Sequence, residues 1–146
     1  MTRVQLRAGR ITALLAILAM GAFASVAFAA TITGTDSANK LTGTNGPDTI
    51  HALGGNDKVS GGGGGETIDG GAGTDLLKGQ DGADTITGGA GFDSIDGGNG
   101  NDTINSHNDG SFDVVECGAG NNDTANVDAG DRVDDDCENV NIIPPV

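Results

Sequence analysis

Acidic residues recur at every ninth position through the middle of this chain of 146 residues. Each ends a glycine-rich stretch, of which Gly97-Gly98-Asn99-Gly100-Asn101-Asp102 is the clearest copy. Glycines permit positive φ angles, so each stretch can curl with its carbonyl oxygens towards one centre, where the acid adds a carboxylate. Calcium, with about six to eight oxygen ligands, suits this donor set better than magnesium, which demands a stricter octahedron, or zinc, which prefers His and Cys. The series reads Asn39, Asp48, Asp57, Glu66, Asp75, Asp84, Asp93 and Asp102.

The three residues after each acid place one aliphatic side chain between two polar neighbours, as in Thr85-Ile86-Thr87. This alternation predicts a short strand with one buried face. Blocks of nine residues follow one another from Gly34 to Asn105 without insertion. Two blocks, each a turn followed by a strand, would close one coil of 18 residues. Stacked coils would form two parallel sheets around a thin core of Leu41, Ile50, Val59, Ile68, Leu77, Ile86, Ile95 and Ile104.

The nonapeptide Gly-Gly-x-Gly-x-Asp-x-aliphatic-x resembles the calcium-binding repeat of the RTX, or hemolysin-type, family. The resemblance implies an all-β parallel β-roll whose turns hold calcium ions between successive coils, through carboxylates and backbone carbonyls. One edge of the roll would stack Asn39, Asp57, Asp75 and Asp93, and the other Asp48, Glu66, Asp84 and Asp102. The implied ligands are Asp48, Asp57, Glu66, Gly73, Asp75, Gly82, Asp84, Gly91, Asp93, Gly100 and Asp102.

Some blocks depart from the repeat. Asn39 carries no charge, and Glu66 has a longer side chain that could shift the ion. Ala52 and Leu53 replace the two leading glycines of their block, and Gln80 replaces the second glycine of another. We therefore expect residues 30–42 to form an N-terminal cap or first degenerate repeat, residues 43–105 to form the roll, and the best sites to lie between residues 70 and 102.

The first 29 residues have the pattern of a secretory signal peptide. Arg3, Arg7 and Arg10 precede an apolar run that ends at the small-x-small site Ala27-Phe28-Ala29. A transmembrane anchor is the alternative, because the run is long enough to be marginal. We expect a secreted, extracellular chain that has no membrane contact once the signal is removed.

The chain is strongly acidic, with 21 Asp and Glu against 7 Lys and Arg and a formal net charge of −14. Such a surface excludes nucleic acid as a partner, because binding a phosphate backbone requires basic residues. Roughly one aliphatic residue per block buries too little apolar surface to offset the backbone entropy of folding. We therefore expect disorder without calcium; a glycine-rich acidic linker that never folds is the alternative, which the phased aliphatic residues disfavour.

After Asn105 the register slips, and residues 106–146 read as degenerate repeats and a C-terminal cap. Cys117 and Cys137 are the only cysteines, and export to an oxidising space predicts a disulfide between them. Metal ligation by the two thiols is the alternative. Residues 105–116 imitate the ligand spacing of an EF-hand loop, although no helical pattern flanks them.

The two histidines have no catalytic motif around them, and repeats and caps fill residues 30–146. We expect His51 and His107 to have no catalytic role, and the chain to be no enzyme. An accessory module that uses the roll as a platform for an extracellular polysaccharide or protein is the alternative function. Its candidate contact residues are Phe92 and Phe112.

Overall fold

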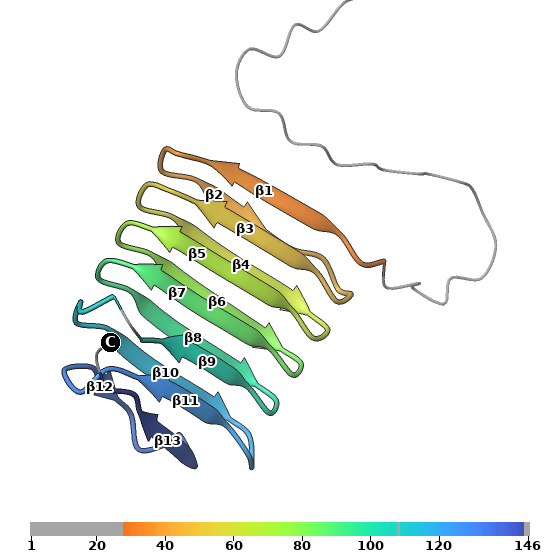
Figure 1. The fold of residues 1–146 in the computed structure, drawn as a ribbon. Coiled ribbons are helices and arrows are strands. Elements are labelled where there is room, and N and C mark those ends of the chain that lie inside the picture. Colours follow the sequence, from red (N-terminus) through yellow and green to blue (C-terminus); the bar gives the residue numbers. More distant parts are fainter. Residues whose placement is uncertain (1–27, 108, 145–146) are drawn as a thin grey trace, which may run out of the picture.

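The computed structural model describes residues 28–107 and 109–144 as one parallel β-roll (Figure 1). The signal peptide expected for residues 1–29 lies outside these residues except for Phe28 and Ala29. Within the described part there is no helix, and therefore no helix long and apolar enough to cross a membrane. The expected all-β class is confirmed, and the EF-hand alternative is wrong because strands flank the loop at residues 107–113.

Successive strands alternate between two sheets, so that each coil contributes one strand to either face. The seven-stranded sheet contains β1 (Thr31–Thr35), β3 (Thr49–Leu53), β5 (Thr67–Ala72), β7 (Thr85–Ala90), β9 (Thr103–Ser106), β11 (Thr124–Val127) and β13 (Asn139–Ile142). The six-stranded sheet contains β2 (Lys40–Thr42), β4 (Lys58–Gly63), β6 (Leu76–Asp81), β8 (Ser94–Asn99), β10 (Val114–Ala119) and β12 (Arg132–Val133).

All strand pairs are parallel, and in the regular part each residue pairs with the residue one coil later. Ile68 pairs with Ile86, and Leu77 with Ile95. This register follows from the period, because two blocks bring the same position of the repeat back to the same sheet. The aliphatic side chain at the eighth position of a block therefore stacks on the one that lies a coil later.

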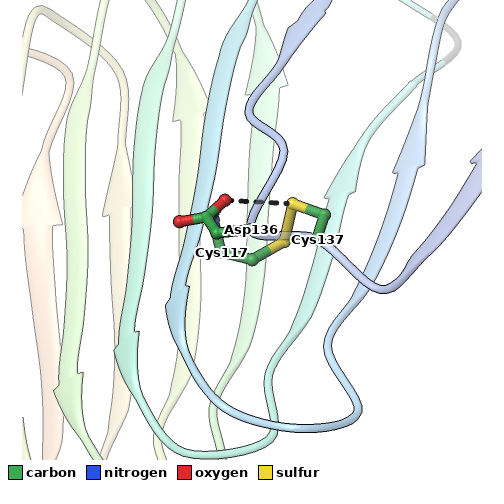
Figure 2. A group of neighbouring side chains, drawn as sticks. All are labelled: Cys117, Asp136 and Cys137. Atoms are coloured by element: carbon green, nitrogen blue, oxygen red, sulfur yellow. Dashed lines mark hydrogen bonds between the residues drawn. A yellow bond between two sulfur atoms is a disulfide. The ribbon is translucent and has the colours of Figure 1, made fainter.

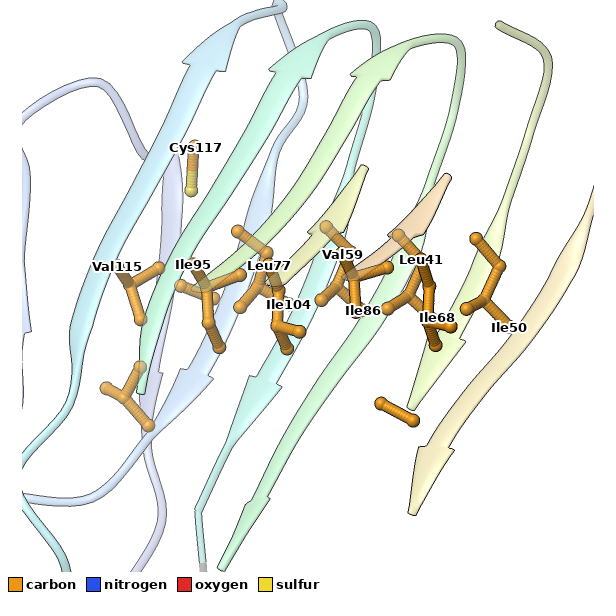
Figure 3. Close-up of a cluster of buried hydrophobic side chains, with 13 residues drawn as sticks. Leu41, Ile50, Val59, Ile68, Leu77, Ile86, Ile95, Ile104, Val115 and Cys117 are labelled. Carbon is orange, nitrogen blue, oxygen red and sulfur yellow. The ribbon is translucent and has the colours of Figure 1, made fainter. Parts of the chain in front are cut away.

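The core is a narrow stack of aliphatic side chains between the two sheets (Figure 3). All eight residues predicted for it are buried, and the roll adds residues from both the repeats and the cap: Ala52, Val115, Cys117, Ala125 and Val127. Val115 pairs with Ile95 and Ala125 with Ile104, so the extra residues near the C-terminus are absorbed in turns and the strands stay in phase.

Candidate metal centre

The turns stack along two edges of the roll, and the acids at the sixth position of each block form a ladder on each edge. On one edge the Asp57 N–H donates to Asp75 Oδ1 at 2.8 Å, and the Asp75 N–H to Asp93 Oδ1 at 2.9 Å. On the other, the Asp84 N–H donates to Asp102 Oδ1 at 2.8 Å. The structure thus stacks these turns along the two edges as the sequence predicts.

The second carboxylate oxygen of most ladder residues has no hydrogen-bond partner, although it is buried. Each of these side chains is at most 3 % exposed. Leaving such an oxygen without a partner in a site removed from water costs several kcal/mol, by general estimates. Oxygens of this kind belong to Asp57, Glu66, Asp75, Asp84, Asp93, Asp102 and Asp123.

Backbone carbonyl oxygens lie beside these unpartnered oxygens. A Cβ added to Gly79 would meet Asp84 Oδ2 and the carbonyl oxygen of Gly97, and one added to Gly70 would meet Asp75 Oδ2 and the Gly88 carbonyl oxygen. The leading glycine is required here because a side chain would fill the space. Carboxylate and carbonyl oxygens around one small space are the donor set that calcium takes.

The fourth-position glycines also carry carbonyl oxygens that point along the edges of the roll. A Cβ on Gly91 would meet the Gly73 carbonyl oxygen, and a Cβ on Gly100 the Gly82 carbonyl oxygen. All of these glycines have positive φ, from +117° at Gly91 to +144° at Gly100. The four glycines predicted as ligands therefore form one carbonyl row on each edge.

Burial and mutual repulsion raise the pKa of several ladder carboxyls. Desolvation is the largest cause of the rise for Asp93, to a pKa of about 7, and for Asp102, to a pKa of about 6. The pKa of Glu66 rises to about 8 through desolvation and through the charges of neighbouring acids, Asp84 among them. Without a cation, these groups therefore resist ionisation in the folded roll.

Two predicted ligands differ from the rest. Glu66 leaves both oxygens without a hydrogen-bond partner, whereas Asp57, Asp75, Asp84, Asp93 and Asp102 leave only one. Asp48 has both oxygens occupied: Oδ1 accepts from the Ala30 N–H at 2.7 Å, and Oδ2 accepts from the Thr44 N–H at 2.5 Å. Glu66 and Asp48 thus differ from the other ladder acids in how many of their oxygens accept hydrogen bonds.

Each ladder continues into the C-terminal cap, further than the sequence analysis took it. The Asp93 N–H donates to Asp113 Oδ1 at 2.7 Å, and the Asp102 N–H to Asp123 Oδ1 at 2.7 Å. The separations of 20 and 21 residues hide this continuation from a search at the regular period. In the sequence, only the glycines at positions 118 and 120 indicate that a turn of the repeat type precedes Asp123.

One cluster in the described residues brings three potential metal ligands together by side chain alone: Cys117, Asp136 and Cys137 (Figure 2). The two sulfurs are joined in a disulfide, with their Cα atoms 5.1 Å apart, which confirms the predicted pairing. The Asp136 carboxylate accepts from the Cys117 N–H at 3.1 Å and the Gly118 N–H at 2.8 Å. The thiol-ligand alternative is wrong, because a disulfide offers no thiolate.

Three further side chains singled out from the sequence, His51, Phe92 and Phe112, lie at the surface of the roll. His51 Nδ1 lies 3.7 Å from an Asp69 carboxylate oxygen on the exposed face of the roll. Phe92 and Phe112 stack on each other, with ring centroids 6.0 Å apart, and are 44 % and 49 % exposed. This arrangement gives the platform alternative no support.

Comparison with known families agrees with this geometry. A family model described as the RTX calcium-binding nonapeptide repeat matches the chain in four overlapping copies, at residues 33–65, 42–77, 60–94 and 78–110. A search of curated proteins and a search of solved structures gave no match.

Proposed function

Because the chain belongs to the RTX calcium-binding nonapeptide repeat family, we propose that it is a secreted protein whose β-roll folds when external calcium enters its glycine-rich turns. The observation that carries this proposal is the row of buried carboxylate oxygens without hydrogen-bond partners. Several calcium ions along the two edges would supply the missing partners. Residues 43–105 would bind them, residues 30–42 and 106–146 would cap the roll, and residues 1–29 would be the export signal.

The proposed ligands are not equivalent. Asp57, Asp75 and Asp93 on one edge, and Asp84 and Asp102 on the other, would each give calcium one oxygen while the second oxygen holds the previous coil. Glu66 would give both oxygens, and Asp48 would bind weakly because protein donors already occupy it. The carbonyl ligands would come from Gly73, Gly82, Gly91 and Gly100.

Folding would depend on calcium because the apolar core is thin and the ladder is negatively charged. Each coil buries one aliphatic side chain per strand in the regular part, which contributes only about 2–3 kcal/mol for each side chain. Ionised acids stacked in the roll repel one another, and the unfolded chain separates them. Calcium binds only where the coils bring its ligands together, so its binding free energy becomes folding free energy.

The other features are consistent with this role. The disulfide requires an oxidising space, as export would provide. The excess of acids disfavours nucleic acid, and we propose no membrane contact for the exported chain. The β-roll is a structural fold, and we propose that the chain has no catalytic activity of its own.

Circular dichroism of the chain from residue 30 onward, during a calcium titration, tests the proposal. We expect a disordered spectrum in calcium-free buffer and a β-rich spectrum at saturating calcium. Magnesium at the same concentrations is the control and should leave the spectrum unchanged. A spectrum that is already β-rich without calcium, and that calcium does not change, would falsify calcium-dependent folding.

A further inference from the structure

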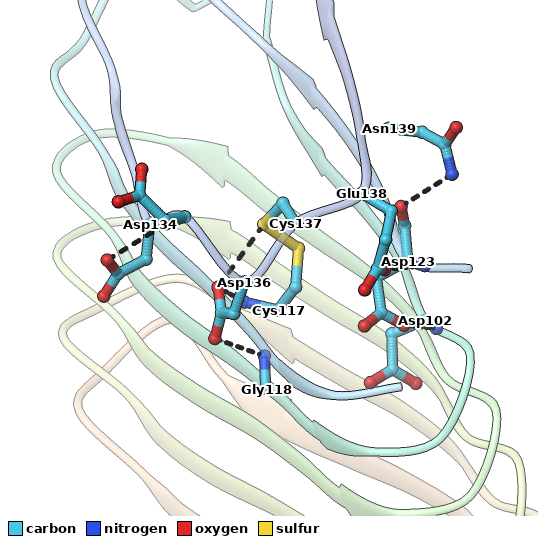
Figure 4. Close-up of a disulfide and its surroundings, with 10 residues drawn as sticks. Asp102, Cys117, Gly118, Asp123, Asp134, Asp136, Cys137, Glu138 and Asn139 are labelled. Carbon is cyan, nitrogen blue, oxygen red and sulfur yellow. Dashed lines mark hydrogen bonds between the residues drawn. A yellow bond between two sulfur atoms is a disulfide. The ribbon is translucent and has the colours of Figure 1, made fainter. Parts of the chain in front are cut away.

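The turn Cys117–Asp123, which begins within β10 and leads into β11, ends in a buried acid beside Asp102, although it lies outside the regular repeats (Figure 4). The family model ends at residue 110, and the inserted residues give Asp123 a separation of 21 from Asp102. We propose that this turn binds a further calcium ion, with Asp123 as its carboxylate ligand. The proposal rests on the proposed function, because it assigns one more site to the same calcium-dependent roll.

Asp123 is fully buried and divides its two oxygens as the repeat acids do. Its Oδ1 accepts from the Asp102 N–H at 2.7 Å, while Oδ2 has no hydrogen-bond partner. A carboxylate oxygen removed from water in this way needs a cation or a donor. Among the described residues no protein donor reaches Asp123 Oδ2, so a cation is the partner that suits it.

Gly120 provides the space and a neighbouring coil provides a backbone ligand. A Cβ added to Gly120 would meet the Gly100 carbonyl oxygen and both carboxylate oxygens of Asp123. Three oxygens from two successive coils therefore surround one small space beside a glycine. Oxygen ligands of mixed type, with no nitrogen or sulfur donor among them, favour calcium over a transition metal.

The final segment of the chain holds both ends of this turn. Asp136 accepts hydrogen bonds from the N–H groups at its start, and the disulfide joins Cys117 to Cys137. At its end, Glu138 Oε2 accepts from the Asp123 N–H at 2.8 Å, and the Asn139 N–H donates to the Asp123 carbonyl oxygen at 2.9 Å. Residues 136–139 thus replace the next coil and hold the turn at both of its ends.

The carbonyl oxygen of Cys117 also faces the preceding site. A Cβ on Gly97 would meet this oxygen together with Asp102 Oδ2. In the repeats, the carbonyl oxygen at the equivalent place belongs to the leading glycine of the next coil. A disulfide-bonded residue therefore provides a backbone carbonyl oxygen beside Asp102. The cap would extend the row of calcium ions by one position before the roll ends.

Native mass spectrometry at saturating calcium can count the bound ions. We expect Asp123→Asn, which keeps the Oδ1 acceptor, to bind one calcium ion fewer than the wild-type chain. Asp135→Asn removes the same charge from an exposed residue of the cap and should keep the wild-type number. Equal numbers for Asp123→Asn and wild type would overturn the cap site, whereas a wild-type chain without calcium would overturn the proposed function itself.

A crystal structure of the calcium-loaded wild-type chain tests the site without any variant. We expect an anomalous difference peak beside Asp123 Oδ2 and the Gly100 carbonyl oxygen, at about 2.3–2.6 Å from both. Calcium peaks in the repeat turns but none beside Asp123 would overturn the cap site and leave the proposed function standing. This readout remains decisive if Asp123→Asn does not fold.

Discussion

Asp93 in the repeats and Asp113 in the C-terminal cap are neighbours in one ladder, yet their carboxylates are satisfied differently. Both are fully buried, and each accepts the N–H of the residue before it in the ladder on Oδ1. Asp93 Oδ2 has no hydrogen-bond partner, whereas Asp113 Oδ2 accepts from the Ser106 hydroxyl at 2.7 Å. One residue type in one position of the fold thus has an unpartnered oxygen in the repeats and a protein donor in the cap.

The same difference, between an unpartnered carboxylate oxygen and one with a protein donor, separates the middle of the roll from its two ends, with the exception of Asp123. At the N-terminal end, Thr44 satisfies Asp48, and in the cap the Asp128 N–H donates to Asp131 Oδ2 at 2.7 Å. A disulfide adds a covalent link at the C-terminal end. The ends therefore supply their own partners, except at Asp123, and the other buried, unpartnered carboxylate oxygens of the described residues lie in the repeats.

Acidification in the absence of calcium should have the largest effect on this comparison. The raised pKa values of Glu66, about 8, Asp93, about 7, and Asp102, about 6, mean that the folded roll binds protons more tightly than the unfolded chain. The stability of the calcium-free roll should therefore rise as pH falls through these values, by several kcal/mol in all, until the unfolded pKa values near about 4 are reached.

Circular dichroism between about pH 8 and pH 5 measures this effect. In calcium-free buffer the β signal should increase on acidification. With calcium the trend should reverse, because protons compete with the ion for the carboxylates. A calcium-free chain that loses β structure on acidification would contradict the assignment of these buried oxygens.

Removal of the disulfide should cost about 3 kcal/mol for a loop of this length, where the two cysteines are 20 residues apart. Urea unfolding of Cys117→Ser with Cys137→Ser, at saturating calcium, gives the loss of unfolding free energy. Hydrogen exchange should locate the loosened amides in residues 117–142 and leave residues 43–93 protected. Equal loosening of both regions would show that the cap and the repeats are one cooperative unit.

Asparagine at the two neighbouring ladder positions compares the metal-dependent and metal-independent acids directly. Asp93→Asn keeps the acceptor for the Asp75 N–H but loses the oxygen proposed for calcium, so we expect a loss of about 2 kcal/mol at saturating calcium. Asp113→Asn should lose less than about 1 kcal/mol, because the Ser106 hydroxyl can accept as well as donate. The calcium concentration at the folding midpoint and the unfolding free energy in urea measure the effect of each variant. Equal losses for the two variants would show that Asp93 and Asp113 do not differ in their dependence on metal.

The smallest expected effect concerns backbone strain within the repeats. Leu53 and Gln80 have φ of 77° and 85°, a conformation that favours glycine. On the next two coils, the position of Gln80 is taken by Gly98 and then, in the cap, by Gly118. Leu53→Gly should stabilise the calcium-loaded roll by about 1 kcal/mol, because a left-handed conformation costs glycine little. Gln80→Gly should gain less, since it also loses a hydrogen bond from the Ser60 hydroxyl. A loss of stability in Leu53→Gly would show that its side-chain contacts outweigh the strain.

The nine-residue period alone determined which residues of the repeats stack and which eight aliphatic side chains form most of the core. Residues one coil apart occupy the same position, so Ile68 must meet Ile86 and Asp75 must meet Asp93 once the coils form. The acid and the glycines before it also predicted an oxygen-rich cation site. These results depend only on local turn and strand geometry repeated at constant spacing, which a sequence records directly.

Only the tertiary structure decided which acids remain without a partner. Ser106, at the end of β9, donates its hydroxyl to Asp113, and Asp123 keeps an oxygen without a partner although its turn is irregular. The disulfide brings residues 136–139 onto that turn. Whether a buried oxygen has a donor depends on distances of a few tenths of an ångström between coils, and residue spacing along the chain does not contain that information.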